Sequence, residues 1–221
     1  MIRFLNPLKE FKWKYIFGEI FLIFIGISLA IWFNNWNASV QSKQDKEIVV
    51  QKIKEEIQHN LKELVNARNE NQITLNALAD YKKLFGSRST EIITSAAHLS
   101  IFQEKYPSFF RIKDSTHVKD DSFKYSGETF INLELADLKE IAWKTTQSIN
   151  IANEFSYECL YELESMYNLQ ARVNNEIDNA ANALYDSEVK KLIRILNILG
   201  QLDAQLEEDY RKMLADIGNC R

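Results

Sequence analysis

Residues 15–33 read YIFGEIFLIFIGISLAIWF, an apolar run that contains a single charged residue, Glu19. As an α-helix, with a rise of 1.5 Å per residue, this run is about 28 Å long. That length is close to the ~30 Å hydrocarbon core of a bilayer. The run therefore predicts a transmembrane helix, which we assign to residues 15–36.

Aromatic residues mark the two ends of this segment. They are Trp13 and Tyr15 at the first end, and Trp32 and Trp36 at the second. The amphipathic rings of Trp and Tyr favour the headgroup level of a membrane. We therefore expect these four residues to anchor the helix at its two interfaces.

Basic residues are distributed unevenly around the segment. Four of them precede it: Arg3, Lys9, Lys12 and Lys14. Only Lys43 and Lys46 lie within about fifteen residues after it. Because an excess of Lys and Arg marks the cytoplasmic side, we expect residues 1–14 to form a basic cytoplasmic N-terminus. Residues 37–221 then form an extracytoplasmic domain, which in a bacterium with an inner membrane and a periplasm is periplasmic.

The chain as a whole carries a formal charge of −4, although its first residues are basic. The expected domain is therefore acidic, whereas a nucleic-acid-binding domain needs a basic face. This charge distribution argues against nucleic acid as a partner. The lipid bilayer is the expected partner, because its anionic cytoplasmic surface attracts the basic N-terminus.

A cleaved signal peptide is the alternative interpretation of the same segment. Ser28 and Ala30 have the small side chains that a signal peptidase requires at positions −3 and −1. The apolar run, however, continues through Ile31, Trp32 and Phe33, and it is longer than a usual signal core. We therefore favour the uncleaved membrane helix.

Three residues within the segment point to contacts with other helices. A carboxylate in a membrane helix is costly, so Glu19 suggests proton transfer, pairing with a cation on another subunit, or an interface-level position near Tyr15. Gly26 and Ala30 form a small-xxx-small pattern, which permits close helix association in lipid. A homo-oligomer is therefore one expected assembly.

The segment also carries a distinctive signature: Gly18-Glu19-Ile20, Ile25-Gly26-Ile27, Leu29-Ala30 and Asn34-Asn35-Trp36-Asn37, followed by a long charged helix. It resembles an uncharacterised family of bacterial single-pass inner-membrane proteins with a GEI…IGI…A…NNWN N-terminus. The resemblance covers about residues 14–37, and the rest of the chain is similar only in helical character. It implies a topology, and no activity, ligand or cofactor.

The remainder of the chain has few helix breakers, with two prolines and six glycines in all. Apolar residues recur at steps of three and four over three long stretches, 40–85, 128–185 and 189–217. A shorter helix, capped by Ser89 or Thr90, extends to about Glu104. A long loop follows at about 107–127, with a short hairpin within it as one option. The expected fold is all-α: a single N-terminal transmembrane helix followed by an up-down-up-down antiparallel helical bundle.

Asn60 and Asn71 fall on the apolar stripe of the first long stretch. A buried asparagine can fix helix register at some cost in stability. The interpretation that we favour rotates the stripe, so that Leu61 and Leu75 face inward and both asparagines lie at its edge.

Two cysteines are too few for a disulfide framework. A hairpin of the last two helices would place Cys220 near residue 150, farther from Cys159 than the ~7 Å Cα limit of a disulfide. We therefore predict that Cys159 is a small core residue and that Cys220 is a free thiol in the tail.

Two arrangements carry candidate metal ligands. Glu56 and His59 have the i, i+3 spacing of helical di-iron bundles, but no second pair of this kind follows. His117 lies among three aspartates of the 107–127 loop, a donor set that suits several divalent cations. We favour a solvated, structural role for both, and we expect no metal and no cofactor.

The sequence contains no nucleophile elbow, phosphate loop, dinucleotide-binding turn or paired-cysteine metal motif. We therefore expect no enzyme. The leading hypothesis is a non-enzymatic interaction or scaffold protein of the cell envelope, with a second copy or another envelope protein as partner. The alternatives are a small-ligand-sensing extracytoplasmic four-helix bundle that signals laterally to a membrane partner, and a metal-dependent enzyme that uses the 107–127 loop.

Overall fold

The computed structural model describes residues 13–85, 91–149 and 151–220. The chain divides into two compact units, the first ending at Val49 and the second beginning at Val50. The described residues are mostly helical, with a small three-stranded antiparallel sheet in the second unit. Most of the expected basic N-terminus, residues 1–12, lies outside the described residues.

The first unit holds the N-terminal part of helix α1 (Trp13–Phe85). Its large apolar side chains are exposed, and the rings of Trp32 and Trp36 stack with centroids 6.5 Å apart. This part of α1 is long and apolar enough to cross a membrane, by length and composition, and none of its most apolar stretch is buried.

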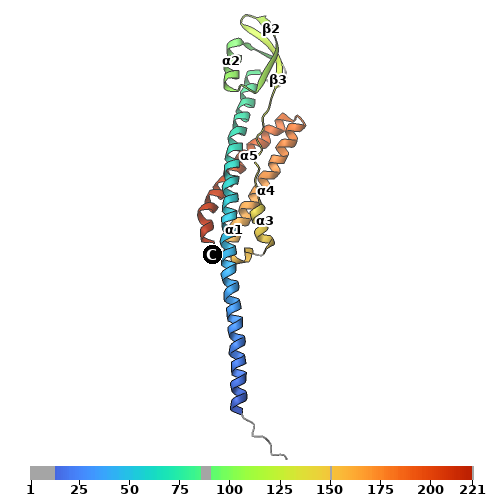
Figure 1. The fold of residues 1–221 in the computed structure, drawn as a ribbon. Helices are drawn as coiled ribbons and strands as arrows, with labels where there is room; N and C mark the ends of the chain where they lie inside the picture. The colour runs from blue at the N-terminus through green and yellow to red at the C-terminus, as the bar shows by residue number, and fades with distance from the viewer. Residues whose placement is uncertain (1–12, 86–90, 150, 221) are drawn as a thin grey trace, which may run out of the picture. The chain divides into compact units, whose positions relative to one another are not determined.

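The second unit continues from α1 through strands and further helices. In chain order these are β1 (Glu91–Ser95), α2 (Ala96–Lys105), β2 (Phe110–Lys119), β3 (Ser122–Thr129), α3 (Ile141–Ser148), the 3-10 helix η1 (Ile151–Glu154), α4 (Tyr157–Tyr185), α5 (Val189–Asp216) and the 3-10 helix η2 (Ile217–Asn219). Figure 1 shows α4 and α5 as a hairpin, and the strands and α2 near the C-terminal end of α1.

Helices α1, α4 and α5 bury the apolar stripes that the sequence predicts. The most buried members are Ile53, Ile57 and Leu64 of α1, Leu163, Met166 and Val173 of α4, and Leu192, Leu206 and Tyr210 of α5. Residues three and four apart lie on one face of a helix, so each stripe becomes a continuous apolar surface. Burial of these stripes is the main stabilisation of the helical part of the unit.

Helices α1 and α4 run in the same direction. Glu56 of α1 contacts Tyr167 of α4. One turn further along α1, Asn60 contacts Gln170, which also lies one turn further along α4. Helix α5 follows a tight turn and runs antiparallel to α4, its partner in the hairpin. Two neighbouring helices with the same direction require a connection that returns along the unit.

That return is made by a non-helical segment, so the helix expected over 128–185 is wrong in its first part. Residues 130–140 form no helix, and the long helix α4 begins only at Tyr157. The segment runs antiparallel to α1 (Figure 1), because Asn132 lies beside Thr74 and Lys139 beside Asn60. The chain that runs antiparallel to α1 is therefore an extended segment and not a helix of an up-down-up-down bundle; we call it the strap. The expected all-α fold is right in its mostly helical content, but the structure adds a three-stranded sheet, and the short helix expected to end near Glu104 is α2.

The stretch 107–127, expected as a long loop with a short hairpin as one option, is mostly the hairpin of β2 and β3. The sheet has the order β1-β3-β2, and β2 carries two register shifts relative to β3. Asp120 has φ of 53° in the two-residue turn, which is the left-handed region that aspartate tolerates better than most residues. The predicted caps of the short helix, Ser89 and Thr90, lie outside the described residues, but the helix begins only at Ala96, because β1 precedes it and Ser95 caps it.

An aromatic-rich cluster joins this sheet to α1. Its buried members are Ala77, Leu78, Ile92, Leu99, Phe102, Tyr106, Phe109, Phe110 and Tyr125. They come from α1, α2 and all three strands, and from the turn between α2 and β2. The cluster explains why this stretch, whose apolar residues lack helical periodicity, is nevertheless ordered.

Cys159 and Cys220 form a disulfide, so the prediction of two separate thiols is wrong. Their Cα atoms lie 5.4 Å apart, within the usual range for such a bond. The prediction assumed that both helices continue straight, but α4 starts at Tyr157 and the chain leaves α5 at Asp216. The short helix η2 then brings Cys220 to the first turn of α4.

Candidate functional site

The candidate residues of the membrane segment all lie on the surface of α1. Glu19, Gly26 and Ala30 are exposed, as are the four aromatic residues expected at the interfaces, Trp13, Tyr15, Trp32 and Trp36. Trp13 and Trp36 lie 23 positions apart on one continuous helix, which corresponds to about 35 Å at 1.5 Å per residue. The surface between them is therefore apolar over the thickness of a bilayer core.

The second unit contains a polar network on the face of α1 that meets the strap. Asn60 is 0 % exposed, so the prediction that it lies at the edge of the stripe is wrong. Its amide accepts a hydrogen bond from the backbone N–H of Lys139 at 2.8 Å and donates one to the carbonyl of the same residue at 2.6 Å. It also donates to the side-chain oxygen of Gln170 at 3.2 Å.

Asn71 of α1 forms the same pair of hydrogen bonds with another residue of the strap, Glu134. Its amide donates to the carbonyl of Glu134 at 2.8 Å and accepts from the backbone N–H at 2.9 Å. Thr74 adds a hydrogen bond to the carbonyl of Asn132 at 2.7 Å. Each asparagine side chain bonds to both the N–H and the C=O of one strap residue, as the backbone of a neighbouring strand would. Because the strap is not helical, these bonds satisfy backbone groups that would otherwise lack an internal partner.

Glu56 anchors the end of the strap at the start of α3. Its carboxylate accepts hydrogen bonds from the backbone N–H groups of Ala142 and Trp143 and from the hydroxyl of Tyr167. A carboxylate is favourable there because unpaired N–H groups and the positive end of the helix dipole meet at a helix N-terminus. Burial, together with the charge of Glu56, raises the pKa of Tyr167.

Gln170 connects this network to α5. Its side-chain oxygen accepts from the hydroxyl of Tyr210 at 2.7 Å, and its nitrogen donates to the carbonyl of Lys139 at 2.9 Å. Burial raises the pKa of Tyr210, so its hydroxyl remains a hydrogen-bond donor at neutral pH. Through these hydrogen bonds, the side chains of Glu56, Asn60 and Gln170 connect α1, the strap, α4 and α5.

Two buried polar atoms among the described residues have no hydrogen-bond partner. They are Nε2 of His59 and Oδ1 of Asp203. Asp203 is 7 % exposed, and burial raises its pKa to about 7, against the opposing effect of the Arg68 charge. Arg68 itself forms an ion pair with Glu207.

The structure does not bring the candidate metal ligands together. Glu56 caps α3, whereas His117 bonds to the carbonyl of Asp120 and packs edge-on against Phe123. Over residues 13–85, 91–149 and 151–220, no group of three or more His, Cys, Asp or Glu side chains is placed to hold a metal ion.

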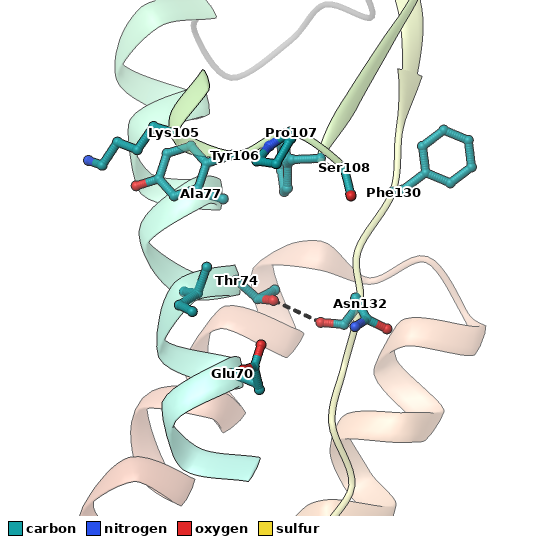
Figure 2. Close-up of a pocket in the computed structure, with 11 residues that line it drawn as sticks. Glu70, Thr74, Ala77, Lys105, Tyr106, Pro107, Ser108, Phe130 and Asn132 are labelled. Atoms are coloured by element: carbon teal, nitrogen blue, oxygen red, sulfur yellow. Dashed lines mark hydrogen bonds between the residues drawn. The ribbon is translucent and has the colours of Figure 1, made fainter. Parts of the chain in front are cut away.

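A cleft of about 350 Å³ opens between α1 and the segments 105–109 and 130–132. Figure 2 shows Glu70, Thr74 and Ala77 of α1 on one side, with Pro107, Ser108 and Asn132 opposite. The walls are mixed: Ile73 and Phe109 contribute apolar surface, and Thr74 contributes a hydroxyl that already bonds to Asn132. Sequence reasoning missed this cleft, because its walls come from three segments that lie far apart along the chain and meet only in the folded unit.

Comparisons with protein-family models, with curated proteins and with solved structures find no match to this chain.

Proposed function

We propose that this protein is a single-pass protein of the bacterial inner membrane that works as a non-enzymatic interaction or scaffold protein of the cell envelope. Residues 1–14 lie in the cytoplasm, residues 15–36 cross the membrane, and residues 37–221 form the domain in the periplasm. The second unit offers its surface to a further copy or to another envelope protein.

The exposed apolar part of α1 is the observation that carries this proposal. A soluble protein seldom exposes a large contiguous apolar surface, because its contact with water is unfavourable. Here the segment from Tyr15 to Phe33 exposes such a surface, with Glu19 as its single charged residue. A lipid bilayer removes this surface from water.

The disulfide supports the periplasmic side for the second unit. Disulfides persist in oxidising compartments such as the bacterial periplasm and are rare in the cytoplasm. The bond between Cys159 and Cys220 agrees with the orientation that the basic residues before the span predict. Two independent features therefore favour the same topology.

The buried polar network supports a structural rather than a catalytic use of the second unit. Glu56, Asn60 and Gln170 direct their hydrogen bonds to backbone and tyrosine partners that hold the strap in place. A catalytic group instead needs a reactive atom that a substrate can reach.

Two measurements test the topology. The intact chain should remain in the membrane fraction after alkaline carbonate washing, at the mass of the unprocessed protein. Its cysteines should resist maleimide labelling in cells until a reductant is added, and they should react without reductant in cells that lack periplasmic thiol oxidation. Release of an intact or shortened chain by carbonate would overturn the proposal.

Affinity purification at near-native expression tests the interaction role. The detergent-solubilised protein should retain a second, differently tagged copy of itself or a defined envelope protein in a fixed ratio. If neither is retained, and chemical cross-linking in intact cells also yields only the monomer, the scaffold role is refuted.

The cleft beside Thr74 favours a second candidate function, a ligand sensor that signals laterally to a membrane partner. A ligand that binds only the folded state raises the midpoint of thermal unfolding. A screen of small molecules against the purified full chain should then find compounds whose stabilisation is lost when Ile73→Trp, at an exposed position of the cleft wall, fills the cleft. If Ile73→Trp leaves the stabilisation unchanged, the cleft is not the binding site.

A further inference from the structure

Glu19 is the lone charge in the apolar segment of α1. It is the only charged residue between Tyr15 and Phe33, and it is exposed on α1. Among the described residues it makes no hydrogen bond or ion pair. Positions three and four residues away hold only Tyr, Ile and Leu, so the helix supplies no cation one turn from it. In an apolar setting, such a carboxylate is stabilised by a cationic partner.

Other features of the span share the face of Glu19. At 100° per residue, Gly26, Ala30 and Asn37 all lie within about 20° of Glu19 around the helix. By the same geometry Ser28 lies on the opposite side and Gly18 about 100° away. We call the surface formed by Glu19, Gly26, Ala30 and Asn37 the Glu19 face. It combines the lone charge with small side chains that let a second backbone approach.

The chain itself does not require a glycine at position 26. A Cβ atom added to Gly26 meets nothing within 4 Å, and the same holds for Gly18. A larger side chain at Gly26 therefore leaves the chain undisturbed, and it clashes only with another molecule that packs on this face. The two glycines differ in their place around the helix, which makes them a matched pair.

The charge decides which kind of helix fits. Two parallel copies packed through the Glu19 face would bring two carboxylates to one depth, where like charges repel strongly because little water screens them. A helix with a basic side chain at that depth neutralises Glu19 instead. Charge complementarity therefore favours a different protein over a second copy.

We propose that the Glu19 face is the docking surface for a transmembrane helix of another protein that carries a lysine or arginine at the depth of Glu19. This inference rests on the proposed membrane anchoring and names the class of partner: a membrane protein with a basic residue inside its span.

Energy transfer in vesicles tests the inference with defined probes. The full chain, labelled with a donor at its N-terminal amine, is reconstituted in phosphatidylcholine vesicles and checked by flotation. The acceptor is a leucine-rich transmembrane peptide with one lysine about 6 Å inside its apolar segment, which is the depth of Glu19 inside Tyr15. The control peptide has leucine in place of that lysine.

The lysine peptide should bind about five- to thirtyfold more tightly than the leucine peptide, the range of one polar contact between membrane helices. Glu19→Gln should abolish this preference, and Glu19→Lys should transfer it to a peptide that carries glutamate instead. Gly26→Leu should weaken binding of the lysine peptide, whereas the matched Gly18→Leu should bind as the unchanged protein does.

Equal binding of the lysine and leucine peptides by a protein that floats with the vesicles overturns the inference and leaves the membrane anchoring intact. A preference that survives Glu19→Gln also overturns it. Energy transfer between two labelled copies that depends on Gly26 but not on Glu19 would assign the face to self-association and overturn the inference as well. A protein that does not float refutes the membrane anchoring itself.

Discussion

Replacing Asn60 by alanine tests whether the strap is held by buried hydrogen bonds. Asn60 lies on α1 and makes two hydrogen bonds to the backbone of Lys139 and one to the side chain of Gln170. Asn71→Ala is the matched control. Asn71 has the same paired geometry with Glu134, but it is partly exposed.

The expected cost depends on which groups lose every partner. After Asn60→Ala the carbonyl of Lys139 still accepts from Gln170, whose oxygen still accepts from Tyr210. The N–H of Lys139 is left without its partner in a part-buried site, which costs about 1–3 kcal/mol in addition to the lost bonds. We expect Asn60→Ala to lower the free energy of unfolding by about 2–4 kcal/mol, and Asn71→Ala by about 0.5–1 kcal/mol because water replaces its amide.

Urea unfolding of the full chain in detergent micelles, with its disulfide intact, measures both values. The midpoints from far-ultraviolet circular dichroism convert to free energies through a shared slope. If the two variants lower the free energy of unfolding by the same amount, to within about 0.5 kcal/mol, then the burial of Asn60 does not strengthen its hydrogen bonds relative to those of Asn71. The account of the strap would then be wrong.

Three further predictions concern other parts of the second unit. Asp203→Asn should stabilise the protein above pH 7 and have little effect near pH 4. Burial raises the pKa of Asp203 to about 7, so the folded state holds this proton more tightly than the unfolded state. The native protein therefore loses stability as pH rises from about 4 to 7, by a few kcal/mol at most. Urea midpoints across this range measure the effect, and a gain that is independent of pH would contradict it. The double substitution Cys159→Ala and Cys220→Ala should remove at most about 4 kcal/mol, the entropy of closing the intervening loop. Thermal unfolding with and without reductant should show that only the native protein responds to reductant. Gly127→Ala should disrupt the β2–β3 hairpin, because its Cβ would overlap the backbone oxygen of Arg111. Faster amide hydrogen exchange confined to residues 110–129 is the expected readout, and unchanged exchange there would refute the clash.

Helical periodicity predicts much of this fold because it is a local signal. The stripe from Ile53 to Leu78 and the stripe of α5 from Leu192 to Met213 are buried as their spacing predicts. Such spacing suffices because every third or fourth residue shares one face whatever lies opposite. The apolar segment after Tyr15 is equally local, since its length and composition alone define it.

The strap shows where local reasoning fails. The sequence of residues 130–140 predicts the beginning of a helix. In the structure, backbone groups of this segment instead form hydrogen bonds with the side chains of Asn60, Asn71 and Thr74, which lie more than 50 positions earlier. No pattern within the strap records those partners. Of the sheet, the sequence offered only a short hairpin as an option; β1 was missed for a related reason, because it joins the hairpin through β3 and through the apolar cluster beneath the strands.

The sequence by itself determined the apolar helix near the N-terminus, the amphipathic helices and the acidic character of the chain beyond residue 36, because each depends on composition or on residues that are neighbours along one helix. Tertiary structure alone decided the disulfide, the burial of Asn60, the strap and the cleft beside it. Each of these depends on which distant segments come together, and that choice is made by the combined packing and hydrogen bonding of the whole unit.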